Sequence, residues 1–177
     1  MCWGRPFTDA MSELELEAVN AFDVGTFVET FGDVYESSPW VAQRAWSDHP
    51  FSSVETLHRS MVAAVENASR KRKLTLLRAH PDLGEQAEMT DASRQEQASA
   101  GLDQLPPDQY EAFQQLNDEY RNRFDFPFIM AVKGSSPEAI RKSMRERLDN
   151  SPDEEFRTAL DEVHEIARLR LTDRMAV

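Results

Sequence analysis

The side chains best suited to chemistry lie in three separate stretches of the sequence, and the first of these contains His80. This histidine directly precedes Pro81, and a helix usually ends before a proline. A histidine at that position projects from a rigid element, and its imidazole titrates near neutral pH, so it can accept or donate a proton. His80 is therefore a candidate acid or base. Without further support, a histidine at such a helix end is structural more often than catalytic.

The second stretch would place a hydroxyl, a carboxylate and an amide side by side. Ser93, Glu96 and Gln97 follow the i, i+3, i+4 spacing that puts side chains on one face of a helix. Together they could surround a small polar molecule. A serine that caps a helix and a glutamate exposed to solvent are the alternative explanation, and the spacing alone favours that alternative.

The third stretch carries two arginines, Arg168 and Arg170. Residues two positions apart on a helix point to nearly opposite sides, so only one of them can face a given pocket. A guanidinium offers a planar fork that matches a carboxylate, which makes an anionic substrate a natural partner. An ordinary ion pair at the surface is the commoner role of an isolated arginine.

The other histidines, His49, His58 and His164, have no supporting motif nearby, and we interpret them as surface or core residues. No pair of ligands has the spacing of a zinc site, and no glycine-rich loop suits a phosphate group, so we predict neither a metal nor a cofactor. Two other classes of function stay open. One is a helical metal-dependent hydrolase that uses His58, His80, His164 and a carboxylate, and the other is a non-enzymatic helical adaptor with an exposed apolar groove.

The elements that would position these residues are helices. The chain has six glycines, and no stretch alternates apolar and polar residues as a strand would. Apolar residues instead recur at three and four positions, and helix-capping residues precede them; a capping box, for example, is expected at Ser52–Glu55. Predicted helices follow Asp23, run from Pro39 through Trp46, open at Ser52–Glu55, end at His80, extend from about Asp91 to Gly101, start at Pro107 and stop before Phe126, run from Ser136 to about Leu148, and begin at Ser151. The sequence therefore predicts an all-α, compact single-domain helical bundle over residues 1–177, with a poorly ordered segment at 1–12.

Composition excludes several partners. The chain has 32 acidic and 20 basic residues, so its net charge of −12 would repel nucleic acid or an anionic membrane surface. The strongly apolar run Phe126–Val132 is much shorter than the roughly 20 residues that span a bilayer. Cys2 is the single cysteine, which suits a reducing compartment. We expect a cytoplasmic protein.

Five segments stand out when the sequence is taken as a whole: Phe27-Val28 with Tyr35–Ala42, Arg78–Gly84, Ser93–Gln97, Phe124–Phe128 and Ile166–Leu171. Together and in this order they resemble the OHCU decarboxylase family, and the resemblance extends over residues 13–173. Enzymes of this family decarboxylate 2-oxo-4-hydroxy-4-carboxy-5-ureidoimidazoline, a late intermediate of uric acid breakdown, and release carbon dioxide and S-allantoin.

The resemblance implies an all-helical, cofactor-free homodimer that binds a small ureido-imidazoline. It makes His80 the catalytic histidine, Glu96 its partner carboxylate, and Arg170, rather than Arg168, the functional arginine. His80 would be the main acid or base at the substrate hydroxyl in a hydrogen-bonded pair with Glu96, and Arg170 would anchor an anionic or carbonyl group. The residues that would contact substrate, the last five of them partly through backbone groups, are Pro81, Ser93, Arg94, Gln95, Gln97, Phe128, Ile129, Met130, Ala131 and Val132.

Overall fold

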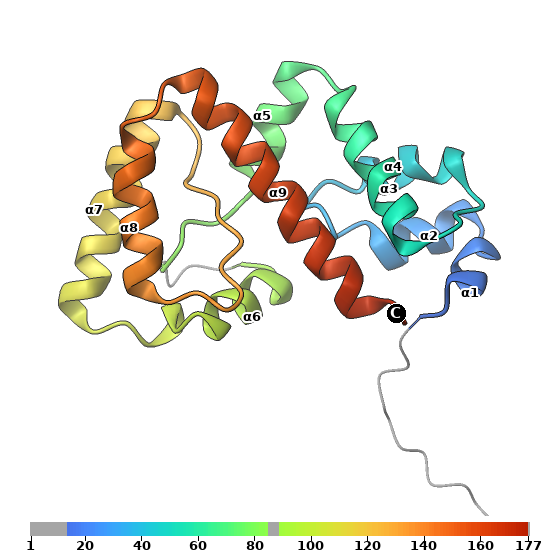
Figure 1. The fold of residues 1–177 in the computed structure, drawn as a ribbon, viewed down its shortest axis with the longest axis horizontal. Helices are drawn as coiled ribbons and strands as arrows, with labels where there is room; N and C mark the ends of the chain where they lie inside the picture. Colours follow the sequence, from blue (N-terminus) through green and yellow to red (C-terminus); the bar gives the residue numbers. More distant parts are fainter. Residues whose placement is uncertain (1–13, 85–88, 177) are drawn as a thin grey trace, which may run out of the picture.

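A computed structural model describes residues 14–84 and 89–176, and every regular element within these ranges is a helix (Figure 1). This confirms the all-α prediction. The predicted disorder of residues 1–12 concerns a segment outside the described residues. The α-helices are α1 (Leu16–Asn20), α2 (Val24–Phe31), α3 (Trp40–Ala45), α4 (Val54–Glu66), α5 (Arg70–Arg78), α6 (Asp91–Ser99), α7 (Pro107–Phe124), α8 (Pro137–Leu148) and α9 (Pro152–Arg174), with short 3-10 turns at Trp46–Asp48 and Leu102–Gln104.

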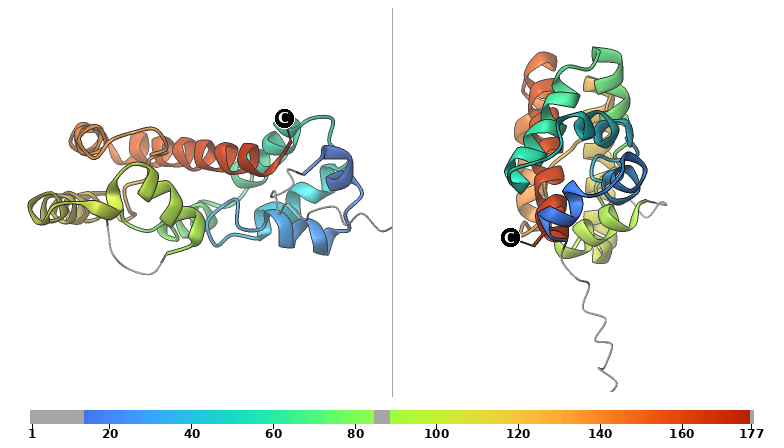
Figure 2. Two further views of the ribbon diagram at one scale, coloured as in Figure 1. Left: turned by 90° about the horizontal axis from the view of Figure 1, so that it is seen from below. Right: turned by 90° about the vertical axis from the view of Figure 1, so that its right-hand side faces the viewer.

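The long helix α9 is the axis around which the other helices are arranged. It crosses the molecule diagonally, with α6, α7 and α8 on one side and α1 to α4 on the other (Figure 1). Its packing partners include α4, α5 and α7. Seen from below, α9 lies along one side of the molecule and runs over much of its length (Figure 2). A helix in this position can bring side chains from both halves of the chain to one site.

Capping residues explain where several helices begin. Ser136 and Ser151 accept hydrogen bonds from backbone N–H groups of α8 and α9, and each is followed by a proline at the first helical position, which needs no N–H partner there. Ser151 forms a reciprocal capping box with Glu154. The capping box expected at Ser52–Glu55 is wrong, because Ser53 is the N-cap of α4 and accepts from the N–H of Thr56.

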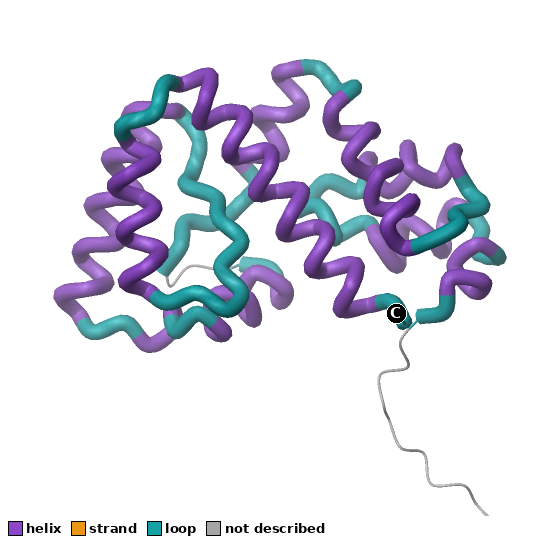
Figure 3. The backbone as a smooth tube through the Cα atoms, viewed as in Figure 1, coloured by secondary structure: helices purple, strands orange, loops and turns teal. Residues whose placement is uncertain are grey.

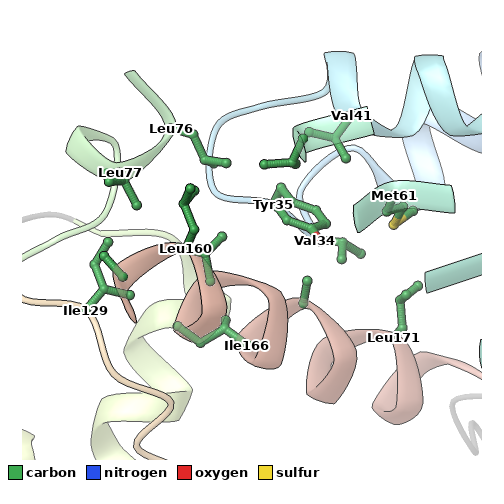
Figure 4. Close-up of a cluster of buried hydrophobic side chains, with 14 of the residues drawn as sticks. Val34, Tyr35, Val41, Met61, Leu76, Leu77, Ile129, Leu160, Ile166 and Leu171 are labelled. Atoms are coloured by element: carbon green, nitrogen blue, oxygen red, sulfur yellow. The ribbon is translucent and has the colours of Figure 1, made fainter. Parts of the chain in front are cut away.

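The helices enclose one contiguous apolar core. Leu160, Val163, Ala167 and Leu171 recur at three and four residues along α9 and are all buried, as expected for the inner face of an amphipathic helix. Figure 4 shows apolar side chains gathered along this helix, among them Val34, Tyr35, Val41, Met61, Leu76, Leu77 and Ile129. The burial of each such side chain is worth roughly 1.5–3 kcal/mol.

Two irregular segments pass close to α9. One joins α5 to α6 and is described except at residues 85–88, and the other, residues 125–136, joins α7 to α8 (Figure 3). The predicted stop of a helix before Phe126 is confirmed, since α7 ends at Phe124. The helix predicted to end at His80 is α5, which ends two residues earlier, at Arg78. Across residues 14–84 and 89–176, no helix has the length and apolar content that crossing a membrane requires.

Candidate active site

A pocket lies where these two irregular segments meet α6 and α9. It brings together side chains that are as much as 90 positions apart in the sequence, including His80, Glu96 and Arg170. The end of α5 and the residues after it contribute His80, Pro81 and Leu83; α6 contributes Ser93, Glu96 and Gln97; residues 128–132 contribute Phe128, Ile129, Met130 and Val132; and α9 contributes Ile166 and Arg170.

Most of the residues predicted for the site line this pocket, but three do not. Arg94 and Gln95 are exposed to solvent, because they follow Ser93 by one and two positions and therefore point away from its face of α6. Ala131 directs its backbone N–H to a carboxylate oxygen of Glu162 at 2.9 Å. Leu83 and Ile166 line the pocket without having been predicted.

His80 is held in one orientation by the end of α5. Its Nδ1 lies 2.9 Å from the carbonyl oxygen of Leu76. A carbonyl only accepts, so Nδ1 carries the hydrogen, and the lone pair of the neutral ring lies on Nε2. Among the residues that the structure describes, Nε2 has no hydrogen-bond partner. His80 is 7% exposed and lies at the pocket wall.

Burial keeps this imidazole neutral. Removal from water lowers the pKa of His80 below its ordinary value, while the negative charge of Glu36 and the hydrogen bond to Leu76 oppose that effect. A neutral imidazole with its lone pair toward a pocket is a proton acceptor, and it becomes a donor once it is protonated. His80 thus has the state required of a general base at neutral pH.

Arg170 is the arginine that faces the pocket, whereas Arg168 is exposed and paired with Glu165. Nε of Arg170 donates to Oε1 of Glu96 at 2.7 Å, and Nη2 of Arg170 lies 3.1 Å from Oε2 of the same carboxylate. A two-point contact of this kind fixes both groups. The predicted hydrogen bond between His80 and Glu96 is not among the contacts of the described residues, in which the Glu96 carboxylate instead faces Arg170.

A buried carboxylate that the sequence analysis missed stands behind Arg170. Glu36, in the segment between α2 and α3, is 2% exposed. Its Oε2 accepts from Nη2 of Arg170 at 2.9 Å and from the hydroxyl of Ser93 at 3.0 Å. Glu36 lies within one of the family-like segments, but no periodicity of the sequence there indicates that its carboxylate is buried.

The turn that follows His80 is fixed by side chains of two helices. Gln97 accepts the backbone N–H of Gly84 at 2.9 Å, and Asn117 donates to the carbonyl of Leu83 at 2.9 Å. Gly84 has a φ of +78°, a left-handed conformation that glycine adopts without strain. Gln97 therefore has a structural task in addition to its place in the pocket wall.

Residues 128–132 contact a buried ion pair that joins α8 to α9. Arg147 of α8 donates to the carbonyl of Ile129 at 2.7 Å and packs over the ring of Phe128 at 4.3 Å. Its guanidinium also pairs at 2.9 Å with Glu155, a carboxylate with no exposed surface. The backbone at Ile129 is thereby fixed before any ligand binds.

The remaining histidines are engaged elsewhere. His164 contacts the hydroxyl of Tyr35 at 2.8 Å and a carboxylate oxygen of Glu66 at 2.9 Å, and Nε2 of His58 lies 2.9 Å from the carbonyl of His164. His49 stacks on Trp46 at the surface. Both ring nitrogens of His164 already contact protein atoms, which gives no support to a metal site built on this residue.

The surface gives no support to an adaptor either. Among the large apolar side chains of the described residues, only Val24 is strongly exposed. A groove that binds an amphipathic helix would instead expose a contiguous set of such side chains.

Comparison with known proteins agrees with the geometry. The family model described as OHCU decarboxylase matches residues 20–172. A 2-oxo-4-hydroxy-4-carboxy-5-ureidoimidazoline decarboxylase from Haloferax volcanii is 60% identical over 94% of this chain and 99% of its own length. The uric acid degradation bifunctional protein PucL from Bacillus subtilis is 42% identical over 89% of this chain and 32% of its own.

Among solved structures, an (S)-allantoin synthase superposes with a TM-score of 0.76 and 28% identity. The match covers 92% of this chain, which spans only about half, 54%, of the synthase chain. The family match extends over most of the sequence and includes every residue that lines the pocket. The chain therefore belongs to the OHCU decarboxylase family.

Proposed function

We propose that this protein decarboxylates 2-oxo-4-hydroxy-4-carboxy-5-ureidoimidazoline to S-allantoin in uric acid degradation. The observation that carries the proposal is the orientation of His80, with Nδ1 bound to the carbonyl of Leu76 and Nε2 left for a molecule in the pocket. The Haloferax volcanii relative, a 2-oxo-4-hydroxy-4-carboxy-5-ureidoimidazoline decarboxylase, and the solved (S)-allantoin synthase support the same reaction.

The chemistry of this substrate explains why the chain needs no cofactor for the proposed reaction. Loss of carbon dioxide leaves an electron pair on carbon, and many enzymes disperse such a pair into a pyridoxal or thiamine ring. The ureido-imidazoline carries its own conjugated carbon–nitrogen system that accepts the pair. Departure of carbon dioxide leaves one negative charge on the conjugated system of the substrate. A proton taken up from solvent neutralises that charge.

In this proposal His80 transfers a second proton, which comes from the hydroxyl of the substrate. Its neutral Nε2 removes the proton of the substrate hydroxyl, and the imidazolium then delivers a proton to one face of the ring carbon that becomes stereogenic in S-allantoin. General acid–base help of this kind is worth roughly 10²- to 10⁴-fold in rate. Glu96, fixed by Arg170 at 2.7 Å, supplies the charge that orients the hydroxyl.

The other contacts to substrate come from both sides of the pocket. Pro81, Ser93 and Gln97 form one side. The backbone of residues 128–130 and 132, fixed at the carbonyl of Ile129 by Arg147 at 2.7 Å, would bind the ureido arm on the other. Arg94 and Gln95 are left out of this set because they do not line the pocket, and Ala131 is left out because its backbone N–H already donates to Glu162 at 2.9 Å.

We further propose that the enzyme is one domain over residues 13–173 that forms a cytoplasmic homodimer. The family match over residues 20–172 supports the single domain, and the family resemblance supports the dimer. The net charge of −12 supports a protein that binds neither nucleic acid nor anionic membranes. Sedimentation equilibrium of the purified protein tests the dimer, and a concentration-independent monomer mass would contradict it.

The reaction is tested with substrate made in place. Urate oxidase and hydroxyisourate hydrolase generate the unstable intermediate from urate, and optical activity is followed with and without the protein. We expect the wild-type protein to produce optically active allantoin. His80→Asn should lose stereospecific formation by roughly 10²-fold or more, with its helical circular dichroism unchanged.

His49→Asn is the matched control, because His49 is exposed and lies outside the pocket. It should retain the wild-type rate. Stereospecific activity retained in His80→Asn would refute the assignment of His80, and a wild-type protein that produces no optically active allantoin would refute the function.

A further inference from the structure

The polar contacts of the Glu36 carboxylate join it to α6 and α9, the two helices whose side chains line the pocket. Its Oε1 accepts from the hydroxyl of Thr90 at 2.8 Å, and its Oε2 accepts from Ser93 and Arg170. Thr90 is the N-cap of α6, and Ser93 and Arg170 line the pocket. One side chain between α2 and α3 thus joins α6 to α9 behind the site.

The contacts of Arg170 show what Glu36 does there. Nε and Nη2 of the guanidinium face Glu96 and Glu36, and Nη1 donates to the carbonyls of Asp33 at 3.2 Å and Val34 at 3.3 Å. All three nitrogens therefore donate to protein acceptors. A guanidinium held in this way has no free donor for a substrate, so the geometry favours Arg170 as a fixed support for Glu96 over an anchor for an anionic group.

The charges around His80 give Glu36 a second effect. Arg170 carries one positive charge and lies between two carboxylates, so the group has a net charge of −1. A negative charge near an imidazole stabilises its protonated form. The charge of Glu36 raises the pKa of His80 and the charge of Arg170 lowers it, while burial lowers it most.

We propose that Glu36 is a positioning residue of the active site, which fixes Arg170 and Ser93 in the pocket wall and supplies the negative charge that lets His80 hold a proton. The proposal rests on the function proposed above. In the buried pocket, an imidazolium without that charge would form at greater cost. Proton transfer from the substrate hydroxyl to His80 would then be slower.

Glu36→Gln removes the charge while nearly preserving the shape. The amide oxygen can take the place of Oε2 and accept from Ser93 and Arg170, and the amide nitrogen can donate to the hydroxyl of Thr90, which rotates to accept. We expect the His80 resonance of the variant to titrate at lower pH than in the wild-type protein, by NMR of the imidazole with His80→Asn for assignment. The acid limb of the kcat profile should move to lower pH, and kcat should fall roughly 10- to 100-fold while KM changes little.

Glu66→Gln is the matched control. Glu66 is also a carboxylate paired with an arginine, Arg157, at 2.7 Å, but it is not among the charges that act on His80. It should change the titration of His164, its hydrogen-bond partner, and leave that of His80 unchanged. An unchanged His80 titration in Glu36→Gln would overturn the proposal. Because the NMR titration needs no substrate, this result is independent of whether the proposed reaction is correct.

If Glu36→Gln does not fold, the titration of His80 and kcat are measured on Glu36→Asp instead. It keeps the charge and withdraws the carboxylate by one methylene, so the titration of His80 should stay close to that of the wild-type protein. The contact with Arg170 should weaken, and kcat should fall. Wild-type kcat in Glu36→Asp would overturn the positioning role.

Discussion

Replacement of Arg147 by methionine should destabilise the fold far more than the loss of an ordinary ion pair would. The side chains of Arg147 and Glu155 are 11% and 0% exposed, and removal of one partner from a buried pair costs about 3–5 kcal/mol. Urea m-values lie near 2 kcal/mol per M for small proteins. The urea midpoint of Arg147→Met should therefore fall by about 1.5–2.5 M, measured by circular dichroism at equilibrium.

Arg59→Met provides the control, because it breaks an ion pair whose side chains are 74% and 71% exposed. Exposed pairs contribute about 0–1 kcal/mol, so its midpoint should change by less than about 0.5 M. The further change Glu155→Gln, added to Arg147→Met, should recover part of the loss because it removes the carboxylate left without a cation. If Arg147→Met shifted the midpoint no more than Arg59→Met does, the reasoning on burial would be refuted.

Two further predictions concern backbone strain and pH. Gly84→Ala should cost about 2–4 kcal/mol of unfolding free energy, because a Cβ there would lie 3.0 Å from Leu105 and 3.3 Å from Phe113. Gly134 has the same φ of +78° and no described atom within 4 Å of such a Cβ, so Gly134→Ala should cost only about 1 kcal/mol. Equal urea midpoints for the two variants would contradict this. Burial lowers the pKa of His58, His80 and His164 below the ordinary value of 6.5, so each binds a proton more readily in the unfolded chain, and stability should be lost as pH falls below 6.5. Urea midpoints measured in high salt, which screens surface repulsion, test this, and a midpoint that rises on acidification would contradict it.

Helix limits were predictable because their causes are local. A capping serine followed by proline opens both α8 and α9, and Gly101, at a φ of +76°, follows α6 as predicted. Each signal acts within a few residues of the chain. The error at Ser52–Glu55 has the same origin, since two adjacent serines left the register of the cap ambiguous by one position.

The choice between Arg168 and Arg170 could have been made from periodicity. Val163, Ile166, Ala167 and Arg170 follow the i, i+3, i+4, i+7 spacing of one helical face, and all are buried. Arg168 instead shares a face with Glu165, to which it is paired at 2.6 Å. An arginine in register with an apolar stripe is one that the fold must bury and pair.

The role of Glu36 could not be predicted from periodicity, because its hydrogen-bond partners are distant in sequence. They lie 54, 57 and 134 positions away, at Thr90, Ser93 and Arg170. No pattern near Glu36 reports those separations. Arg147 could not be predicted from local patterns either, because its contact with the carbonyl of Ile129 joins α8 to a residue 18 positions earlier, in the segment that precedes α8. Residues that touch the reacting molecule can be inferred from their chemical type, whereas residues that hold them depend on tertiary packing.

Two buried arginine–carboxylate pairs contact the residues that line the pocket. Apolar residues of similar volume could fill the same space with equal or greater stability. They could not direct donors at fixed points, as Arg170 does at Glu96 and Arg147 does at the carbonyl of Ile129. Groups that are already oriented need not reorganise when charge moves in the reaction, which is the main source of electrostatic catalysis. The two arginines thus make the pocket rigid in the places where the proposed proton transfer and the ureido arm require it.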